Sequence, residues 1–367
     1  MNATSTLVLP ALAAALGLAL IGCGAANETP ANADPTHGGS ALSGTLDGAG
    51  SSAQQAAQAA WQAHFQSAHP GVTVNYDPVG SGAGVDQFLS GGVAFAGSDK
   101  YLTADQLTAS KKTCHGATAF DVPDYVSPIA IAYHLDGVDH LKLSPKTAAG
   151  IFAGTITKWN DPAIQADNPG ARLPSSRITP VHRSDDSGTT NNFTDYLHQT
   201  APSVWTDPAA ETWPYKSGEA AQGTSGVVAA IKSGNGTIGY ADRSQVGALS
   251  VASVKVGSRY VAPSPTGAAK ALADSSTTAG RPAGDLAIQV NRTTTSPGAY
   301  PILLVSYLIA CPSYPDSATG TLVKTYLGYV VSGAGQQAAA QTAGSAPLPG
   351  TLASKAASKV QSIGAGH

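Results

Sequence analysis

The feature that most constrains the fold is a repeated alternation of strand-forming and helix-forming segments along the chain. Short apolar or alternating runs predict strands, and Ala-rich or amphipathic runs between them predict helices. The expected strands are 72–79, 93–97, 129–133, 178–182 and 300–309. The expected helices are 53–68, 84–89, 145–153, 161–165, 191–199, 322–331 and 352–363. This alternation predicts an α/β fold of mixed, mostly parallel sheets with flanking helices. The stretch Ser332-Gly333-Ala334-Gly335 is expected to end the helix before it.

Length and charge limit the classes of protein and partner. The 367 residues suffice for about two domains, and 42% of them are hydrophobic. Only 12% are charged, and the formal net charge is -3. No basic excess is present that would attract nucleic acid, so we expect no nucleic-acid partner. If a chain so near neutrality binds an anion, it must hold that anion by locally aimed donors rather than by a broad electric field.

The N-terminus has the pattern of an exported lipoprotein. Residues 7–21 are apolar but short for a membrane span, and Leu20-Ile21-Gly22-Cys23 follows the bacterial lipobox. We therefore expect residues 1–22 to be a signal peptide and Cys23 to be lipidated. Residues 23–43, rich in Ala, Asn, Pro and Gly, are then a flexible tether. An ordinary signal peptide ending near a lone Cys is the alternative, and the first ten residues lack the usual basic residue.

Two cysteines remain after Cys23. They are Cys114 and Cys311. In an exported protein an even pair predicts a single disulfide. The alternative is a pair of buried free thiols.

Four segments rich in small residues follow expected strands or open expected helices. They are 48–53, 80–84, 96–99 and 183–190. The first turn of a helix has free backbone N–H groups and a partial positive charge, so it can bind an anion. Gly permits close approach, and Ser and Thr add hydroxyl donors. Each segment alone is more commonly a simple helix cap, but four of them together favour an oxyanion site.

Arg183, Asp185 and Asp99 refine the chemistry of that site. Arg183 offers a planar, permanently charged fork that suits a tetrahedral oxyanion, and Asp185 can orient it. A carboxylate such as Asp99 repels an anion unless that anion carries a proton to donate, as phosphate does and sulfate does not. The alternatives are a surface ion pair for Arg183 and Asp185, and a cap for the helix near Thr103 for Asp99.

Signatures of catalysis are missing from the sequence. No Gly-x-Ser-x-Gly nucleophile elbow and no Gly-x-x-x-x-Gly-Lys-Ser/Thr phosphate loop occurs. The nine histidines are scattered without zinc-ligand spacing. We therefore expect no catalytic residue, no metal and no cofactor.

Several motifs together resemble the PstS group, the phosphate-binding proteins of the Pst-type ABC importer. The motifs are 48–52, 74–76, 80–82, 95–99, 154–162, 183–189 and 236–240. The resemblance implies that inorganic phosphate is dehydrated in a cleft and held by hydrogen bonds, with Asp99 accepting the phosphate proton and Asp185 pairing with Arg183. The implied phosphate-binding residues are Ser51, Ser52, Ala53, Ser81, Asp99, Arg183, Asp185, Ser187, Gly188 and Thr189.

The resemblance also implies a fold and partners. The fold is the two-domain periplasmic-binding-protein fold (type II), with two crossover strands, 129–133 and 301–305, forming the hinge. Domain I would combine 44–128 with 302–367, and domain II would be 129–301. The partners would be the permease and ATPase subunits of the importer, and the protein would be a monomer at the outer face of the cell membrane, held there only by its lipid.

Two departures from the family pattern stand near the expected site. Ala53-Gln54 replaces an aromatic residue followed by Pro, and Asp186 replaces a common Gly. We expect Asp186 to face solvent. Three other functions stay open: the same fold binding phosphonate or molybdate, a surface adhesin or phosphate sensor without a permease, and a phosphatase.

Overall fold

The computed structural model describes residues 42–365. The expected signal peptide, Cys23 and all but the last two residues of the expected tether lie outside these residues. The strands are β1 (Ser43–Gly50), β2 (Gly71–Asp77), β3 (Phe95–Ser98), β4 (Phe120–His134), β5 (Lys142–Leu143), β6 (Thr179–Arg183), β7 (Glu219–Ala221), β8 (Thr237–Asp242), β9 (Ser250–Val251), β10 (Ser253–Val256), β11 (Arg259–Val261), β12 (Ser276–Thr277), β13 (Ile288–Gln289), β14 (Leu303–Ala310), β15 (Ser313–Tyr314) and β16 (Gly364–Ala365).

Helices alternate with these strands, as the sequence predicts. They are α1 (Gln55–Ala68), α2 (Ser81–Ser90), α3 (Ala104–Thr113), α4 (Pro145–Phe152), α5 (Pro162–Asp167), α6 (Gly188–Thr200), α7 (Gly223–Ser233), α8 (Pro265–Ala273), α9 (Ser317–Val330), α10 (Gly333–Ala343) and α11 (Gly350–Gln361), with a short 3-10 turn at Arg243–Gln245.

The main sheet has the strand order β2-β1-β3-β14-β4-β8-β6-β7. Its two ends are parallel: β1 pairs with β2 and β3, and β6 pairs with β7 and β8. The central strands β14 and β4 are antiparallel to each other and to their outer neighbours. We call β2-β1-β3 with α1, α2 and the residues that follow β3 the first half, and β8-β6-β7 with α6 and α7 the second half.

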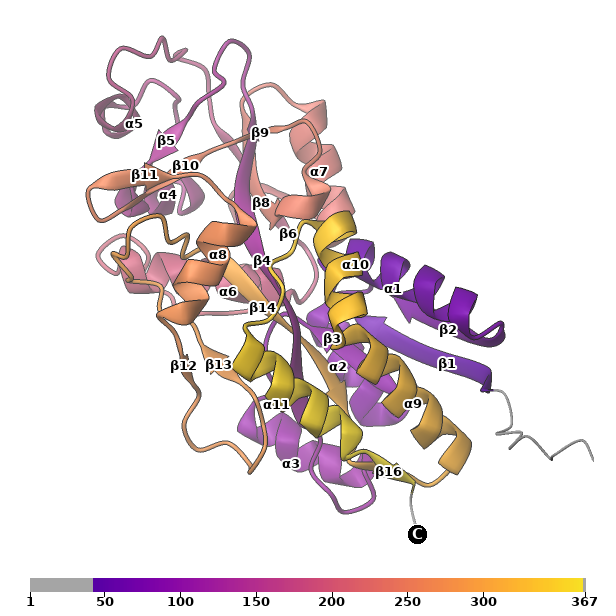
Figure 1. The fold of residues 1–367 in the computed structure, drawn as a ribbon. Coiled ribbons are helices and arrows are strands. Elements are labelled where there is room, and N and C mark those ends of the chain that lie inside the picture. The colour runs from indigo at the N-terminus through magenta and orange to yellow at the C-terminus, as the bar shows by residue number, and fades with distance from the viewer. Residues whose placement is uncertain (1–41, 366–367) are drawn as a thin grey trace, which may run out of the picture. The chain divides into compact units, whose positions relative to one another are not determined.

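Strand β4 joins the two halves (Figure 1). Its first part pairs with β14 from Phe120 to Pro128, and its second part pairs with β8 from Ile129 to His134. The sequence predicts only 129–133 because Pro123 and Asp124 interrupt the apolar pattern. The ladder accommodates them by a register shift between Ser306 and Tyr307, which leaves Asp124 as the extra, unpaired residue.

Side-chain caps explain where several helices begin. Thr103 forms a reciprocal capping box at the start of α3, and Ser187 caps α6 by accepting from the N–H of Thr190. One expectation is incomplete here. The stretch from Ser332 to Gly335 does end α9, but Ser332 also caps α10 by accepting from the N–H of Gly335. The start of α10 was not predicted because its first three residues include two glycines, which are typical of a helix end.

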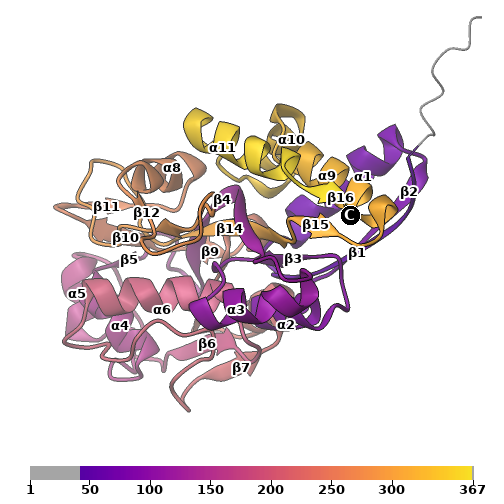
Figure 2. The same ribbon diagram turned by 90° about the horizontal axis from the view of Figure 1, so that it is seen from below.

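Helices cover both faces of the sheet, so the strands between them are buried. Figure 2 shows α1, α9, α10 and α11 above β1, β3 and β14, and α2 and α3 below these three strands. Every residue of β14 is buried, as are all residues of β4 except its last. Trp61 of α1 is fully buried and donates its indole N–H to the Gly335 carbonyl, 2.8 Å away. No helix within residues 42–365 combines the length and apolar character that a bilayer span needs.

The predicted disulfide is confirmed. Cys114, at the end of α3, is bonded to Cys311, directly after β14, and their Cα atoms are 5.2 Å apart. Both residues are buried. The bond therefore ties α3 to the central strand across a sequence separation of 197 residues.

Candidate functional site

Four helices begin close to one another at the junction of the two halves. Helices α1 and α2 follow β1 and β2 in the first half, and α6 and α7 follow β6 and β7 in the second. Hydrogen bonds connect their first turns: the Gly82 N–H donates to the Asp186 carbonyl at 3.2 Å, and the Thr224 N–H donates to Ser52 Oγ at 3.0 Å. The partial positive charges of these helix starts converge on one place.

The carboxylate of Asp99 lies at the centre of this place, directly after β3. Its Oδ2 accepts from Ser51 Oγ at 2.6 Å and from Thr189 Oγ1 at 3.0 Å, and its Oδ1 accepts from Ser306 Oγ at 3.1 Å. Asp99 is only 2% exposed. Burial raises the pKa of this carboxyl, while the three hydroxyls and the Arg183 charge act in the opposite direction. The arrangement is an acceptor surrounded by hydroxyl groups from both halves.

The main chain of Asp99 is held as well. Its N–H donates to Ser81 Oγ at 3.2 Å, and its carbonyl accepts from Asn192 Nδ2 at 2.6 Å. Ser81 begins α2 of the first half, and Asn192 belongs to α6 of the second. The alternative interpretation of Asp99 as a cap of the following helix is wrong, since Thr103 caps α3.

Arg183 supplies a buried positive charge at the end of β6. Its Nε donates to Asp185 Oδ1 at 2.7 Å and its Nη2 to Asp185 Oδ2, so the pair is bidentate. The N–H of Gly223 also donates to Asp185 Oδ1 at 3.0 Å. Burial alone would raise the pKa of Asp185, but the hydrogen bonds and charge of Arg183 outweigh it and hold that pKa below its usual value. Asp185 thus orients Arg183, as the sequence predicts.

The remaining expected residues lie at the helix starts. Ser52 Oγ is 3.0 Å from Thr224 Oγ1, and the Ala53 N–H donates to Ser51 Oγ at 3.1 Å. Ser187 caps α6, and Gly188 is its first residue. The structure therefore connects all ten sequence-predicted residues through contacts with one another or with their immediate neighbours.

Glycines allow the two halves to approach closely. A Cβ atom on Gly188 would lie 2.6 Å from Ser81 Oγ and 2.9 Å from the Asp99 Cβ. A Cβ atom on Gly80, whose φ is +106°, would lie 2.5 Å from Asp185 Oδ2 and 3.6 Å from Arg183 Nη2. Side chains at these positions would separate α6 from Asp99 and the Arg183–Asp185 pair from α2.

One further expectation about the site is confirmed, and three residues are added to the sequence interpretation. Asp186 is exposed and accepts from Thr212 Oγ1 at 2.8 Å, so the expectation that it faces solvent is confirmed. Thr224, Ser306 and Asn192 contact the site although the sequence does not single them out. Gly223-Thr224-Ser225-Gly226 has the composition of the other helix starts and offered a signal. The only signal for Ser306 and Asn192 was that each is a polar residue in an element that is buried.

Comparison with known proteins gives the family. A family model described as a PBP superfamily domain matches residues 35–334. The phosphate-binding protein PstS 3 of Mycobacterium tuberculosis H37Rv is 36% identical over 95% of this chain and 96% of its own. PstS 2 of the same strain is 38% identical over 96% of this chain and 97% of its own.

Solved structures agree on the fold. A high-affinity periplasmic phosphate-binding protein bound with phosphate, PfluDING, is 23% identical, with a TM-score of 0.69 over 85% of this chain and 92% of its own. A phosphate-binding protein from Stenotrophomonas maltophilia is 19% identical, with a TM-score of 0.66 over 86% of this chain and 94% of its own. The expected two-domain periplasmic-binding-protein fold is confirmed. The chain belongs to the PstS family of phosphate-binding proteins within the PBP superfamily.

Proposed function

We propose that this protein captures inorganic phosphate between its two halves and catalyses no reaction. The observation that carries the proposal is a buried carboxylate, Asp99, encircled by hydroxyls and helix N-termini, together with the buried guanidinium of Arg183. Hydroxyls, backbone N–H groups and the guanidinium donate to phosphate oxygens, and Asp99 accepts the phosphate proton. The ligand set is the ten residues expected from the sequence.

The two halves correspond to two domains in this proposal. Domain I consists of 44–128 and 302–367, and domain II consists of 129–301. The register of β4 supports this division, because its pairing changes from β14 to β8 at Ile129. Opening and closing about the crossover strands 129–133 and 301–305 would admit and then enclose the anion.

Delivery to a transporter completes the proposed role. The protein would pass phosphate to the permease and ATPase subunits of an ABC importer, working as an extracytoplasmic monomer anchored through lipid on Cys23. The names of the relatives support phosphate as the ligand. A purified sample that hydrolyses a chromogenic phosphate ester would contradict the non-catalytic role. Import genes beside its own would support delivery over an adhesin or sensor role.

Selection of phosphate over sulfate is the direct test of the role of Asp99. Isothermal titration of the wild type should show phosphate binding and at least about 100-fold weaker sulfate binding, because sulfate leaves the buried carboxylate facing an unprotonated oxygen. Asn at position 99 offers a donor in place of one acceptor. Asp99→Asn should therefore lower the phosphate-to-sulfate affinity ratio at least about tenfold. Equal affinities in the wild type would remove the role given to Asp99, and strong molybdate or phosphonate binding would change the ligand.

Closure of the two halves is tested by Gly188→Ala. The added methyl would contact Ser81 Oγ and Asp99, so α6 must withdraw from the site. We expect phosphate affinity to fall at least about tenfold, because the Thr189 hydroxyl and the α6 N-terminus move with it. Gly333→Ala is the matched control: Gly333 also begins a Ser-capped helix, and its added Cβ would meet nothing within 4 Å. Equal affinities of the two variants would show that close approach at Gly188 is not needed.

A further inference from the structure

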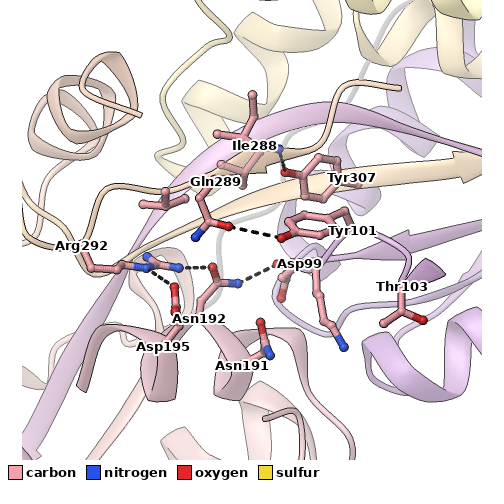
Figure 3. Close-up of a pocket in the computed structure, with 13 residues that line it drawn as sticks. Asp99, Tyr101, Thr103, Asn191, Asn192, Asp195, Ile288, Gln289, Arg292 and Tyr307 are labelled. Carbon is pink, nitrogen blue, oxygen red and sulfur yellow. Dashed lines mark hydrogen bonds and ion pairs between the residues drawn. The ribbon is translucent and has the colours of Figure 1, made fainter. Parts of the chain in front are cut away.

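A cavity of about 290 Å³ lies beside Asp99, between α6 and the segment that leads into β14. Figure 3 shows Asn192 inside this region, between Asp99 and Arg292. Asn192 is 6% exposed and Arg292 only 2%. Neither residue belongs to the proposed phosphate-binding set, and a buried polar side chain needs partners to offset its lost hydration.

The amide of Asn192 uses both of its ends. Its Nδ2 donates to the Asp99 carbonyl at 2.6 Å and to the Gly188 carbonyl at 2.9 Å. Its Oδ1 accepts from Arg292 Nη2 at 2.5 Å. Gly188 and Asn192 share helix α6 of the second half, whereas Asp99 follows β3 of the first. The bond to Asp99 therefore crosses between the halves, and withdrawal of α6 from Asp99 would break it.

Arg292 determines which way round the Asn192 amide lies. A guanidinium only donates hydrogen bonds, so it pairs with the oxygen of the amide. The NH2 group of the amide is then left to donate to the two carbonyls. The reversed amide would place its oxygen against the Asp99 carbonyl and its NH2 against Arg292, and both contacts would be repulsive.

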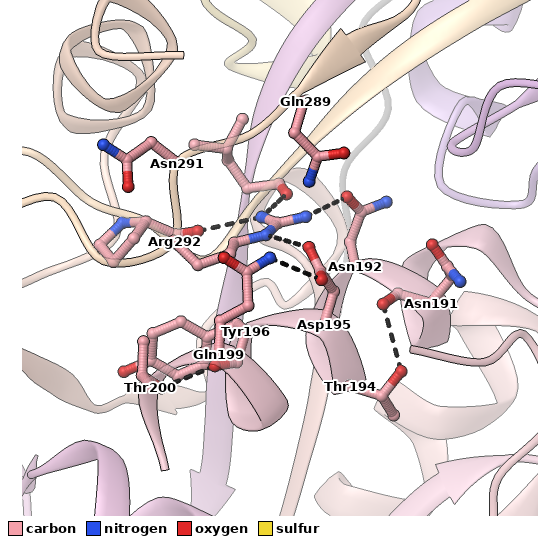
Figure 4. A network of polar contacts seen from close by, with 12 residues as sticks. Asn191, Asn192, Thr194, Asp195, Tyr196, Gln199, Thr200, Gln289, Asn291 and Arg292 are labelled. Atoms are coloured by element: carbon pink, nitrogen blue, oxygen red, sulfur yellow. Dashed lines mark hydrogen bonds and ion pairs between the residues drawn. The ribbon is translucent and has the colours of Figure 1, made fainter. Parts of the chain in front are cut away.

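Arg292 itself is fixed by several acceptors (Figure 4). Its Nε donates to Asp195 Oδ2 at 2.8 Å, and its Nη1 donates to the carbonyls of Pro301 at 3.0 Å and Leu303 at 2.7 Å. Leu303 is the first residue of β14. The guanidinium thus connects the middle of α6 to the start of β14. Asn192, which contacts Asp99, lies in this same part of α6.

We propose that Asn192 is a positioning residue that bridges α6 to the Asp99 main chain in the closed protein, and that Arg292 acts through it by fixing its amide. This inference rests on the proposed phosphate function. It predicts a kinetic role: the bridge exists only when the halves are together, so its loss accelerates phosphate release more than it slows capture.

The test measures the release of radiolabelled inorganic phosphate from the full-length protein after a chase with excess unlabelled phosphate. Asn192→Asp keeps the size of the side chain but turns the donor that faces the Asp99 carbonyl into a repelling oxygen. We expect its release rate to rise at least about tenfold and its association rate to stay within about threefold. Asn192→Ala, which removes the bridge without repulsion, should raise release in the same direction.

Asn191→Ala is the matched control. Asn191 lines the same cavity from the same helix, yet none of the hydrogen bonds found within residues 42–365 uses its side-chain amide. Its release rate should equal that of the wild type. Equal rates for Asn191→Ala and Asn192→Asp in a wild type that binds phosphate would overturn the bridge alone. A wild type that binds no phosphate would overturn the proposed function and this inference with it.

A double-mutant cycle separates the action of Arg292 through Asn192 from a general structural role. Arg292→Lys keeps the charge but cannot reach all of the acceptors, so it should accelerate release by itself. In the Asn192→Ala background the same change should have little further effect on release, even though it still lowers the melting temperature. Fully additive effects on the release rate would show that Arg292 does not work through Asn192.

Discussion

Replacing Arg183 by alanine is expected to weaken phosphate binding by at least about 2 kcal/mol, or about 30-fold. The side chain of Arg183 is 2% exposed, and its bidentate partner Asp185 is 13% exposed. Truncation removes the buried positive charge that the proposed function places beside the anion. It also leaves Asp185, a carboxylate, facing that anion without compensation. Isothermal titration of the wild type and the variant measures the loss.

Arg172→Ala provides the comparison for the change in net charge. Arg172 is exposed, and its removal changes the formal charge of the protein by the same amount. Its phosphate affinity should match the wild type. Arg183→Lys should retain part of the binding, because an ammonium keeps the charge but cannot pair with Asp185 through two parallel bonds. Unchanged affinity of Arg183→Ala would mean that the anion does not bind beside this guanidinium.

Removal of the disulfide is expected to lower the free energy of unfolding by up to about 5 kcal/mol. The bond between Cys114 and Cys311 closes a loop with a sequence separation of 197 residues, so it restricts the unfolded chain strongly. The Cys114→Ala/Cys311→Ala double variant leaves no free thiol in residues 42–365, and denaturant unfolding compares its stability with that of the oxidised wild type.

Reduced wild-type protein serves as the second comparison. It retains both cysteine side chains, so packing changes are smaller than in the double variant, and it should lose most of the same stability. If oxidised and reduced proteins unfold at the same denaturant concentration, the bond does not restrict the unfolded chain in the way that loop closure requires.

Much of the fold follows from local pattern. Helix 53–68 and strand 178–182 match α1 and β6 to within two residues, because their apolar spacing and their bounding turns agree. The start of β4 does not follow, since Pro123 and Asp124 contradict a strand locally and only the bulge opposite Ser306 accommodates them. Long-range pairing determines that segment.

The site likewise contains residues that the sequence indicates and residues that only the folded structure reveals. Ser51, Asp99 and Arg183 stand in or directly beside Gly- and Ser-rich turns whose chemistry is visible in the sequence. The role of Asn192 is not visible in the sequence, because an asparagine inside a helix ordinarily has a solvated side chain. Its role depends on Arg292, 100 residues away in sequence, and on the Asp99 carbonyl, 93 residues away. No local pattern records such contacts.

The charges of Arg183, Asp185 and Asp99 have a consequence for the salt concentrations at which the protein can bind its ligand. With both carboxylates ionised, these groups sum to minus one, so an approaching dianion experiences no attraction from them at long range. A basic surface patch attracts anions less as dissolved salt shortens the Debye length, which is about 8 Å at physiological ionic strength. Discrimination here comes from short bonds formed after the ion has shed its hydration. Brackish surroundings should therefore leave uptake by such a receptor nearly undiminished.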